Sequence, residues 1–288
     1  MSQLHRVAVA CFILGVLAFP APASAQAFLN GDWVGLFHED QPERAPGPEV
    51  GDYLGLPVNE AGRLYADSWD ASRLTLPEHQ CRAHAVPYIN RGPIRMRISE
   101  EKDPLTQATT AVKIFLSTYA QERTVHLDGR PHPPEYAPHT WQGFSTGRWN
   151  GNALVVETTH IKRGWHRRNG LPQSEHTKLT EIIYRHGNVL THVTITDDPA
   201  FLTEPMVKTT NHLLDLNTQP ADYQAWLFCQ ADDEVPGRDP AWVPHYLPGQ
   251  NPYIREFAQR FKLPFEATRG GADTAMPEYM RRLQGGTR

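Results

Sequence analysis

The stretch GFSTG at residues 143–147 matches G-x-S-x-G, the pattern of a serine-hydrolase nucleophile elbow. In an elbow the serine lies on a tight turn between a strand and a helix. Here Ser145 is followed by Gly-Arg-Trp-Asn-Gly-Asn and then by the β-prone run ALVVETT, and Asn-Gly is a strong hairpin signal. The pattern therefore predicts strand, turn and strand, with Ser145 inside a strand.

Two tryptophans flank this serine at a spacing that suggests a binding surface. Trp141, Gly143, Ser145, Gly147 and Trp149 alternate with period two, so they should share one face of a strand. Glycines between tryptophans leave room for a ring or a neighbouring backbone. We therefore predict that Ser145, Trp141 and Trp149 contact a substrate.

Two further predicted strands each carry one ionisable side chain in an otherwise uncharged row. The rows are Leu154, Val156, Thr158 and His160, and Leu179, Glu181 and Ile183. An ionisable group in such a row is costly unless it is paired or functional. If both rows face one interior, His160 and Glu181 would meet as a catalytic acid–base pair or as metal ligands. The alternative is that Glu181 pairs with an arginine such as Arg163 or Arg185.

Other residues suggest ligand contacts without defining a reaction. No H-E-x-x-H or Cys/His metal motif is present, so no cofactor is predicted; a divalent metal is possible, with His126, His160 and Glu181 as candidate ligands. Arg163, in the basic loop HIKRGWHRRNG, could receive a carboxylate or sulfate. Tyr119 and Trp165 could stack on a ligand, although such aromatics are more often core residues.

The surrounding pattern predicts a mainly β protein. β-prone runs separated by turn signals fill 109–230, whereas 26–108 is irregular and rich in proline. We predict an antiparallel meander that forms a barrel or half-barrel, lipocalin-like in broad shape, in a single domain over 26–250. Helices are expected within 59–69 and in the C-terminal segment 251–288.

The N-terminus predicts export. Residues 1–25 combine a short basic start, an apolar run and Ala-Ser-Ala at 23–25, which is typical of a signal peptide cleaved after Ala25. A periplasmic or extracellular location favours a disulfide between Cys81 and Cys229, with two unpaired thiols as the alternative. The formal net charge is −4 with no basic stripe, so nucleic acid is an unexpected partner, and no further stretch predicts a membrane span.

The central half of the chain resembles a large family of exported bacterial proteins. The shared pattern is D-G-R-x-H-P, W-x-G-x-S-x-G-x-W-x-G-x-x-L-x-V-x-T, T-E and D-P-x-x-x-T-x-P, which this chain matches from Asp128 to Pro205. The resemblance implies export and one connected domain, but no activity. His160 and Ile161 stand where many of these proteins have Phe-Asn, so a role of His160 would belong to a subgroup.

Three functions fit these observations. The first is an exported non-redox enzyme that uses His160 and Glu181 on a small molecule or glycoside, as a lyase, isomerase or hydrolase. The second is a binding or carrier protein for a small ligand, because barrels of this size often hold one. The third is an envelope scaffold protein. The fold alone does not separate them.

Overall fold

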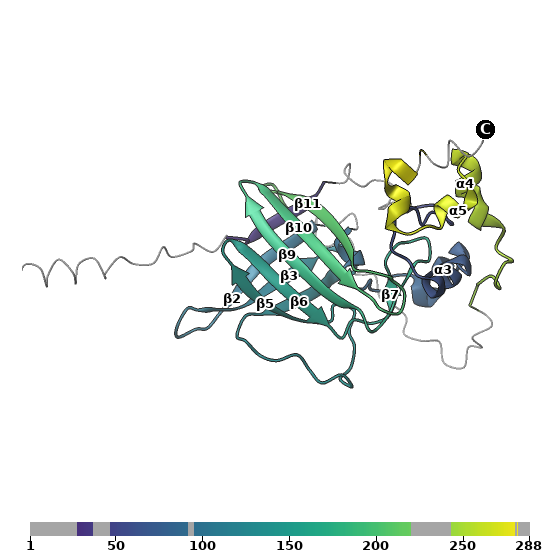
Figure 1. The fold of residues 1–288 in the computed structure, drawn as a ribbon. Coiled ribbons are helices and arrows are strands. Elements are labelled where there is room, and N and C mark those ends of the chain that lie inside the picture. Colours follow the sequence, from purple (N-terminus) through teal and green to yellow (C-terminus); the bar gives the residue numbers. More distant parts are fainter. Residues whose placement is uncertain (1–27, 37–46, 92–94, 220–242, 280, 282–288) are drawn as a thin grey trace, which may run out of the picture.

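The computed structural model describes residues 28–36, 47–91, 95–219, 243–279 and 281, and its centre is a closed nine-stranded barrel (Figure 1). The strand order around the barrel is β1-β11-β10-β9-β6-β5-β4-β3-β2. The strands are β1 (Gly31–Gly35), β2 (Arg95–Lys102), β3 (Thr109–Leu116), β4 (Gln121–His126), β5 (Phe144–Asn150), β6 (Ala153–Thr159), β9 (Lys178–His186), β10 (Val189–Asp197) and β11 (Met206–Leu214). The predicted mainly β barrel is confirmed.

The topology departs from a simple antiparallel meander at one place. β4 and β5 are parallel and share only two register pairs, Val125 with Ser145 and His126 with Thr146. The intervening segment 127–143 is long enough to return the chain to the same end of the barrel, as parallel neighbours require. The other barrel pairs are antiparallel.

Two barrel strands lie in the segment 26–108 that the sequence predicted to be irregular. β1 pairs with both β2 and β11 and so closes the barrel. These strands were hard to predict because β1 is only five residues long and because β2, RMRISEEK, is mostly charged on its outward face. Its inward residues, Met96 and Ile98, belong to the barrel core.

The interior of the barrel is divided between an apolar core and a polar region. Strand alternation directs every second side chain inward. The apolar part includes Trp33, Ile114, Leu154, Val156 and Leu190, each at most 3% exposed. Buried polar side chains follow on β4, β5, β6, β9 and β10, and they form the network described below.

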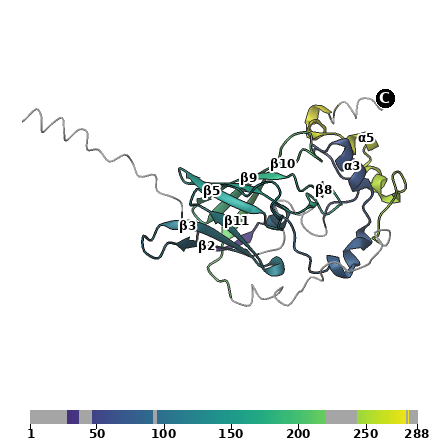
Figure 2. The same cartoon turned by 90° about the horizontal axis from the view of Figure 1, so that it is seen from below.

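Short helices gather at one end of the barrel, as Figures 1 and 2 both show. They are α3 (Glu60–Asp67), η2 (Ala71–Thr75), η3 (Pro77–His79), η4 (Tyr88–Arg91), η5 (Thr118–Ala120), η8 (Pro252–Arg255), α4 (Glu256–Phe261), α5 (Phe265–Thr268) and η9 (Ala272–Ala275), with a two-stranded sheet of β7 (Gly164–Trp165) and β8 (Pro172–Gln173) beside them. α3 lies within the predicted range 59–69, and Asn59 caps it, since Asn59 Oδ1 accepts from Gly62 N at 2.9 Å.

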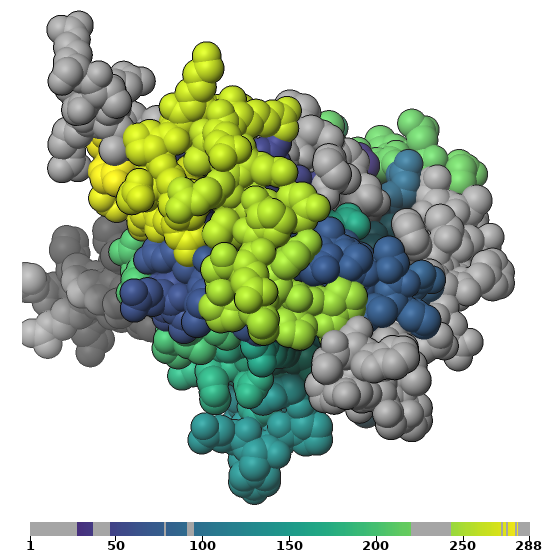
Figure 3. All heavy atoms as spheres, turned by 90° about the vertical axis from the view of Figure 1, so that its right-hand side faces the viewer, coloured from purple at the N-terminus to yellow at the C-terminus, as the bar shows by residue number. Residues whose placement is uncertain are grey.

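The C-terminal helices pack on the N-terminal segment. Figure 3 shows the C-terminal residues lying against residues of the 47–80 region. Asn251 Nδ2 donates to Asp67 O at 2.8 Å and to Trp69 O at 3.1 Å, and Arg269 forms a two-pronged ion pair with Asp67. Segments that are distant in the sequence thus form one cap.

Residues of the segment 85–91 extend into the barrel core and fix the loops around them. Ala85, Val86 and Ile89 belong to the same apolar cluster as the barrel interior. Val86 N donates to Trp141 O at 3.1 Å, and Gln173 Nε2 donates to Val86 O at 2.9 Å. The segment 85–91 therefore brings the loop that carries Trp141 next to β8.

Several predictions concern residues that the structure does not describe. The proposed signal peptide lies outside the described residues, as does Cys229, so the cleavage after Ala25 and the Cys81–Cys229 disulfide stay predictions. No helix of the described chain has the length and apolar character needed to cross a membrane.

Candidate functional site

A buried ion pair organises the polar part of the barrel interior. Arg123 on β4 donates through Nη1 to Glu181 Oε1 at 2.8 Å and through Nη2 to Glu181 Oε2, and both side chains are at most 3% exposed. His192 Nε2 lies 2.8 Å from Glu181 Oε1. Arg123 also donates to Ser145 Oγ at 3.0 Å and to Thr158 Oγ1 at 2.6 Å. Five strands thus contribute to one connected network.

The partners of Glu181 keep its carboxylate charged. Burial on its own would raise the pKa of this carboxyl, but the charge of Arg123 and the hydrogen bonds from Arg123 and His192 outweigh burial and hold the pKa below its ordinary value. A general acid or base needs a pKa nearer to the working pH. Glu181 therefore acts as the counter-ion of Arg123 in this geometry.

The structure does not bring His160 and Glu181 together, so the predicted pairing of these two residues is wrong. β6 ends at Thr159, and His160 has a φ of 57°, which breaks the alternation that would have pointed its ring inward. His160 Nδ1 lies 2.8 Å from Thr159 Oγ1, and His160 Nε2 lies 2.9 Å from Pro134 O. Its contacts tie the loop 127–143 to the end of β6.

The predicted metal ligands do not converge. His126 packs against Phe144 with ring centroids 5.2 Å apart, whereas His160 and Glu181 belong to the separate networks described above. Within the described ranges, no three His, Cys, Asp or Glu side chains are grouped in a way that could hold a metal ion.

Ser145 lies in a strand, as predicted. β5 and β6 form an antiparallel hairpin with a turn at Gly151, so the G-x-S-x-G match is not a nucleophile elbow. Ser145 is 1% exposed and hydrogen-bonds to Arg123 and to Thr158 Oγ1, the latter at 2.9 Å. Neither contact supplies a base, so the hydroxyl is not activated as a nucleophile.

A second histidine–carboxylate pair lies where β8 meets the end of β10. Asp198 accepts from His166 Nε2 at 3.1 Å, from Ser174 Oγ at 2.6 Å and from Ser174 N at 2.9 Å. Burial lowers the pKa of His166 despite Asp198, so the ring is neutral. The Asp198-Pro199 motif of the shared pattern is thus a hydrogen-bonding centre between loops.

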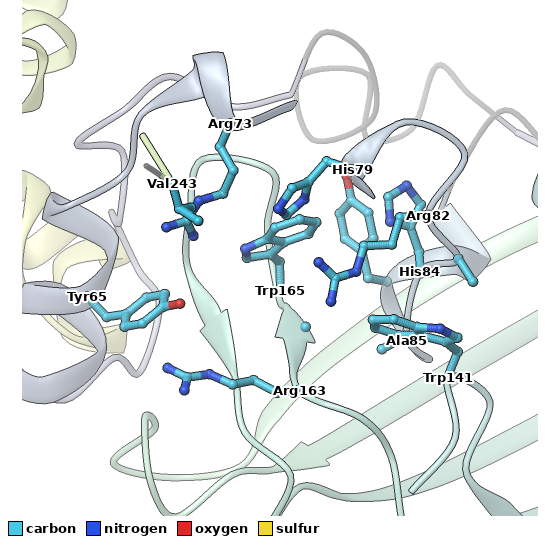
Figure 4. A pocket seen from close by; sticks show the side chains of 13 residues that line it. Tyr65, Arg73, His79, Arg82, His84, Ala85, Trp141, Arg163, Trp165 and Val243 are labelled. Carbon is cyan, nitrogen blue, oxygen red and sulfur yellow. The ribbon is translucent and has the colours of Figure 1, made fainter. Parts of the chain in front are cut away.

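A pocket with converging charged groups lies outside the barrel, between its end and the N-terminal segment (Figure 4). Its volume is about 260 Å³. The lining residues come from separate parts of the chain and combine cationic side chains with aromatic rings: Tyr65, Arg73, His79, Arg82, Ala83, His84, Ala85, Tyr88, Trp141, Arg163, Gly164, Trp165 and Val243. We call this the cationic–aromatic pocket.

The described lining of the pocket carries positive charge. Three arginines and two histidines line it, and none of the described lining residues is Asp or Glu. Figure 4 shows Arg73 and Arg163 extending on opposite sides of Tyr65, with Trp165 between this group and Arg82. Arg73 Nε is buried and has no hydrogen-bond partner. A ligand anion would supply the acceptor that this group lacks.

The histidine at the back of the pocket stays neutral at pH 7. Burial lowers the pKa of His84 to about 4, and the charges of Arg168 and Arg82 act in the same direction. His84 also contacts Tyr119 edge to face, with ring centroids 5.2 Å apart. The positive charge of the pocket therefore comes from its arginines.

The predicted substrate-binding residues divide between two surfaces and the core. Trp141 and Arg163 line the cationic–aromatic pocket, and Tyr119 contacts it through His84. Ser145 lines a separate cavity between β4 and β5, which also reaches Trp141. Trp149 instead packs against the barrel core, because the inward face of β5 borders the apolar part of the interior at this residue.

Sequence reasoning missed Arg123 and His192 inside the barrel and two arginines of the pocket. Arg123 alternates with Gln121 and Val125, and His192 alternates with Leu190. Each is thus an ionisable side chain in an otherwise uncharged row, as Glu181 is. Arg73 lies in the five-residue helix η2 and Arg82 in an irregular segment, and neither is long enough in regular structure for periodicity to mark the direction of a side chain.

Comparison with family models, with curated proteins and with solved structures gave no match. The function therefore has to be argued from the site itself.

Proposed function

We propose that this protein is an exported binding protein for a small anionic molecule that carries an aromatic ring. The observation that supports it is the cationic–aromatic pocket, where three arginines and four aromatic residues face one concavity and no acid stands among the lining residues that the structure describes. Guanidinium groups favour carboxylate, sulfate and phosphate, whereas the indole and phenol rings favour a flat apolar body. A volume of about 260 Å³ suits a ligand of one ring.

Aromatic residues already hold the arginines in place. The guanidinium carbon of Arg163 lies 4.7 Å from the ring centroid of Tyr65, and that of Arg82 lies 5.0 Å from the ring centroid of Trp141. Such contacts restrict rotation of a long side chain, so a ligand loses less conformational entropy on binding. Export follows from the proposed signal peptide, and N-terminal sequencing of the secreted protein should begin at Gln26.

The acid–base enzyme with His160 and Glu181 lacks a supporting arrangement. The two side chains have separate hydrogen-bond partners, and Arg123 neutralises Glu181. We therefore base the function on the pocket and not on that pair.

The test compares ligands that differ in charge or ring. Binding of benzoate, of benzyl alcohol and of acetate is followed by tryptophan fluorescence, because Trp141 and Trp165 line the pocket. We expect saturable binding of benzoate, and binding at least about tenfold weaker for each of the other two. Equal binding of benzyl alcohol and benzoate would contradict an anion site.

Two variants and a matched control locate the site. Arg73→Gln and Arg163→Gln should each weaken benzoate binding about tenfold, because each removes a charge-assisted donor. Arg148→Gln removes the same charge from an exposed position on β5 outside the pocket and should leave binding unchanged. An equal effect of all three would indicate only long-range attraction.

A further inference from the structure

A second cavity opens through the wall of the barrel where β4 and β5 separate. Only two residue pairs join these strands, Val125 with Ser145 and His126 with Thr146. Gly143, which directly precedes β5, has a φ of +66°, and a Cβ there would lie 2.6 Å from Thr159 O. The resulting cavity has a volume of about 430 Å³. Its lining, which we call the β4–β5 gap, is Gln121, Glu122, Arg123, Thr124, His126, Thr140, Trp141, Gln142, Gly143, Phe144 and Ser145.

Two buried glutamines in this gap have unused hydrogen-bonding atoms. Gln142 Nε2 donates to Gln121 Oε1 at 2.7 Å and to His84 O at 3.1 Å, which fixes both amides. Gln121 Nε2 and Gln142 Oε1 are left without partners, although the two residues are only 7% and 8% exposed. A buried polar atom without a partner is costly, so a ligand that satisfies both atoms gains affinity. One atom is a donor and the other an acceptor.

The charged groups of the gap are already compensated. Arg123 is paired with Glu181 inside the barrel, and Glu122 lies 3.6 Å from Lys113. Burial lowers the pKa of His126, which keeps this ring uncharged at neutral pH. An ionic ligand would meet no unbalanced opposite charge here, in contrast to the cationic–aromatic pocket.

Aromatic side chains complete the lining. Phe144 lies on the outer side of β5 between His126 and His132, with ring centroids 5.2 Å and 5.3 Å away. Trp141 borders the gap on one side and the cationic–aromatic pocket on the other. The gap thus combines flat apolar surfaces with neutral donors and acceptors, which matches a ring whose faces are C–H groups and whose edge carries hydroxyls.

We propose that the β4–β5 gap is a binding site for a neutral carbohydrate. Adjacent ring hydroxyls accept from Gln121 Nε2 and donate to Gln142 Oε1, and a sugar face packs against the aromatic lining. The inference does not depend on the anion site, because it uses a different cavity and neutral chemistry.

The experiment titrates isotope-labelled protein with methyl glucoside, methyl galactoside and methyl N-acetylglucosaminide, and follows amide chemical shifts by NMR. Tetrahydropyran-2-methanol, a similar ring without the adjacent ring hydroxyls, serves as the control ligand. At least one glycoside should give saturable shifts that map to 121–124 and 140–145, and the control ligand should not. The absence of saturable shifts with all three glycosides at concentrations up to about 100 mM would overturn the proposal.

A matched pair of variants separates recognition from stability. Gln142→Met should weaken glycoside binding about tenfold, because it removes the acceptor and frees Gln121. Gln173→Met is the control, since Gln173 is also a buried glutamine with an unpartnered Oε1 but does not line the gap. Equal loss in both variants, or none in Gln142→Met, would refute the assignment. If Gln142→Met does not fold, the amide chemical-shift map of the unmodified protein tests the proposal by itself. Arg73→Gln should bind glycosides normally, so the two sites can fail independently.

Discussion

Removing the positive charge of Arg123 from the barrel interior should lower the free energy of unfolding far more than removing a positive charge from the outer surface of the barrel. In Arg123→Met, Glu181 loses its ion-pair partner while it remains fully buried, and Ser145 and Thr158 lose a donor. Breaking a buried pair by removing one partner costs about 3–5 kcal/mol. Because single domains have a free energy of unfolding of about 5–15 kcal/mol, the variant should lose a large part of its stability.

The assay is urea unfolding at pH 7 followed by circular dichroism, with two comparison variants. Arg97→Met removes an arginine from the outward face of β2, where its side chain is 51% exposed and pairs with Asp32, so the loss should be at most about 1 kcal/mol. Arg123→Met combined with Glu181→Met removes both buried charges and should be more stable than Arg123→Met alone.

The same pair predicts how stability responds to acid. The partners of Glu181 hold its folded-state pKa below the ordinary value of 4.5. The stabilisation by ionised Glu181 is therefore fully present above pH 4.5 and is lost as the pH falls below it toward the folded-state pKa. The reasoning would be refuted if Arg123→Met lost less than about 1 kcal/mol, or if the double variant lost the sum of both single losses.

Three further predictions test other parts of the structure. His84 should titrate with a midpoint near pH 4 by NMR, because burial disfavours its charged form; a midpoint near 6.5 would contradict the buried setting. Gly147→Ala should lose about 1–3 kcal/mol in urea unfolding, because the added Cβ would lie 2.7 Å from Val125 Cγ1, and Val125→Ala should recover part of that loss. Asp198→Asn should lose about 2–4 kcal/mol, because an amide has one acceptor oxygen and cannot accept from His166 on one side and from Ser174 Oγ on the other as the two carboxylate oxygens do; a loss below about 1 kcal/mol would show that these bonds are replaceable.

Several residues of the pattern that this chain shares with exported bacterial proteins lie around one buried side chain. Ser145, Thr158 and Glu181 of the pattern all contact Arg123, which the pattern does not include. Gly147 lies against Val125 and Leu127, where a side chain would collide. The pattern thus describes how β5, β6 and β9 pack around one buried guanidinium.

Local sequence determined the elements whose signals act over a few residues. The period-two rows of β6 and β9 follow from backbone geometry, and the Asn-Gly turn at 150–151 follows from the positive φ that only a few residues adopt easily. Those signals were sufficient to reject the nucleophile elbow at Ser145 and to direct Glu181 inward.

Tertiary structure alone decided which of these residues meet. One residue of positive φ took His160 out of its row, and the long segment 127–143 made β4 and β5 parallel, which placed Arg123 beside Glu181 and opened the β4–β5 gap. The cationic–aromatic pocket has the same origin, because Arg73, in the short helix η2, and Arg163, in a loop, are far apart in the chain and neither belongs to a long periodic element. Residue spacing determines to which face of a strand a side chain points, whereas contacts between strands and loops depend on how the whole chain folds.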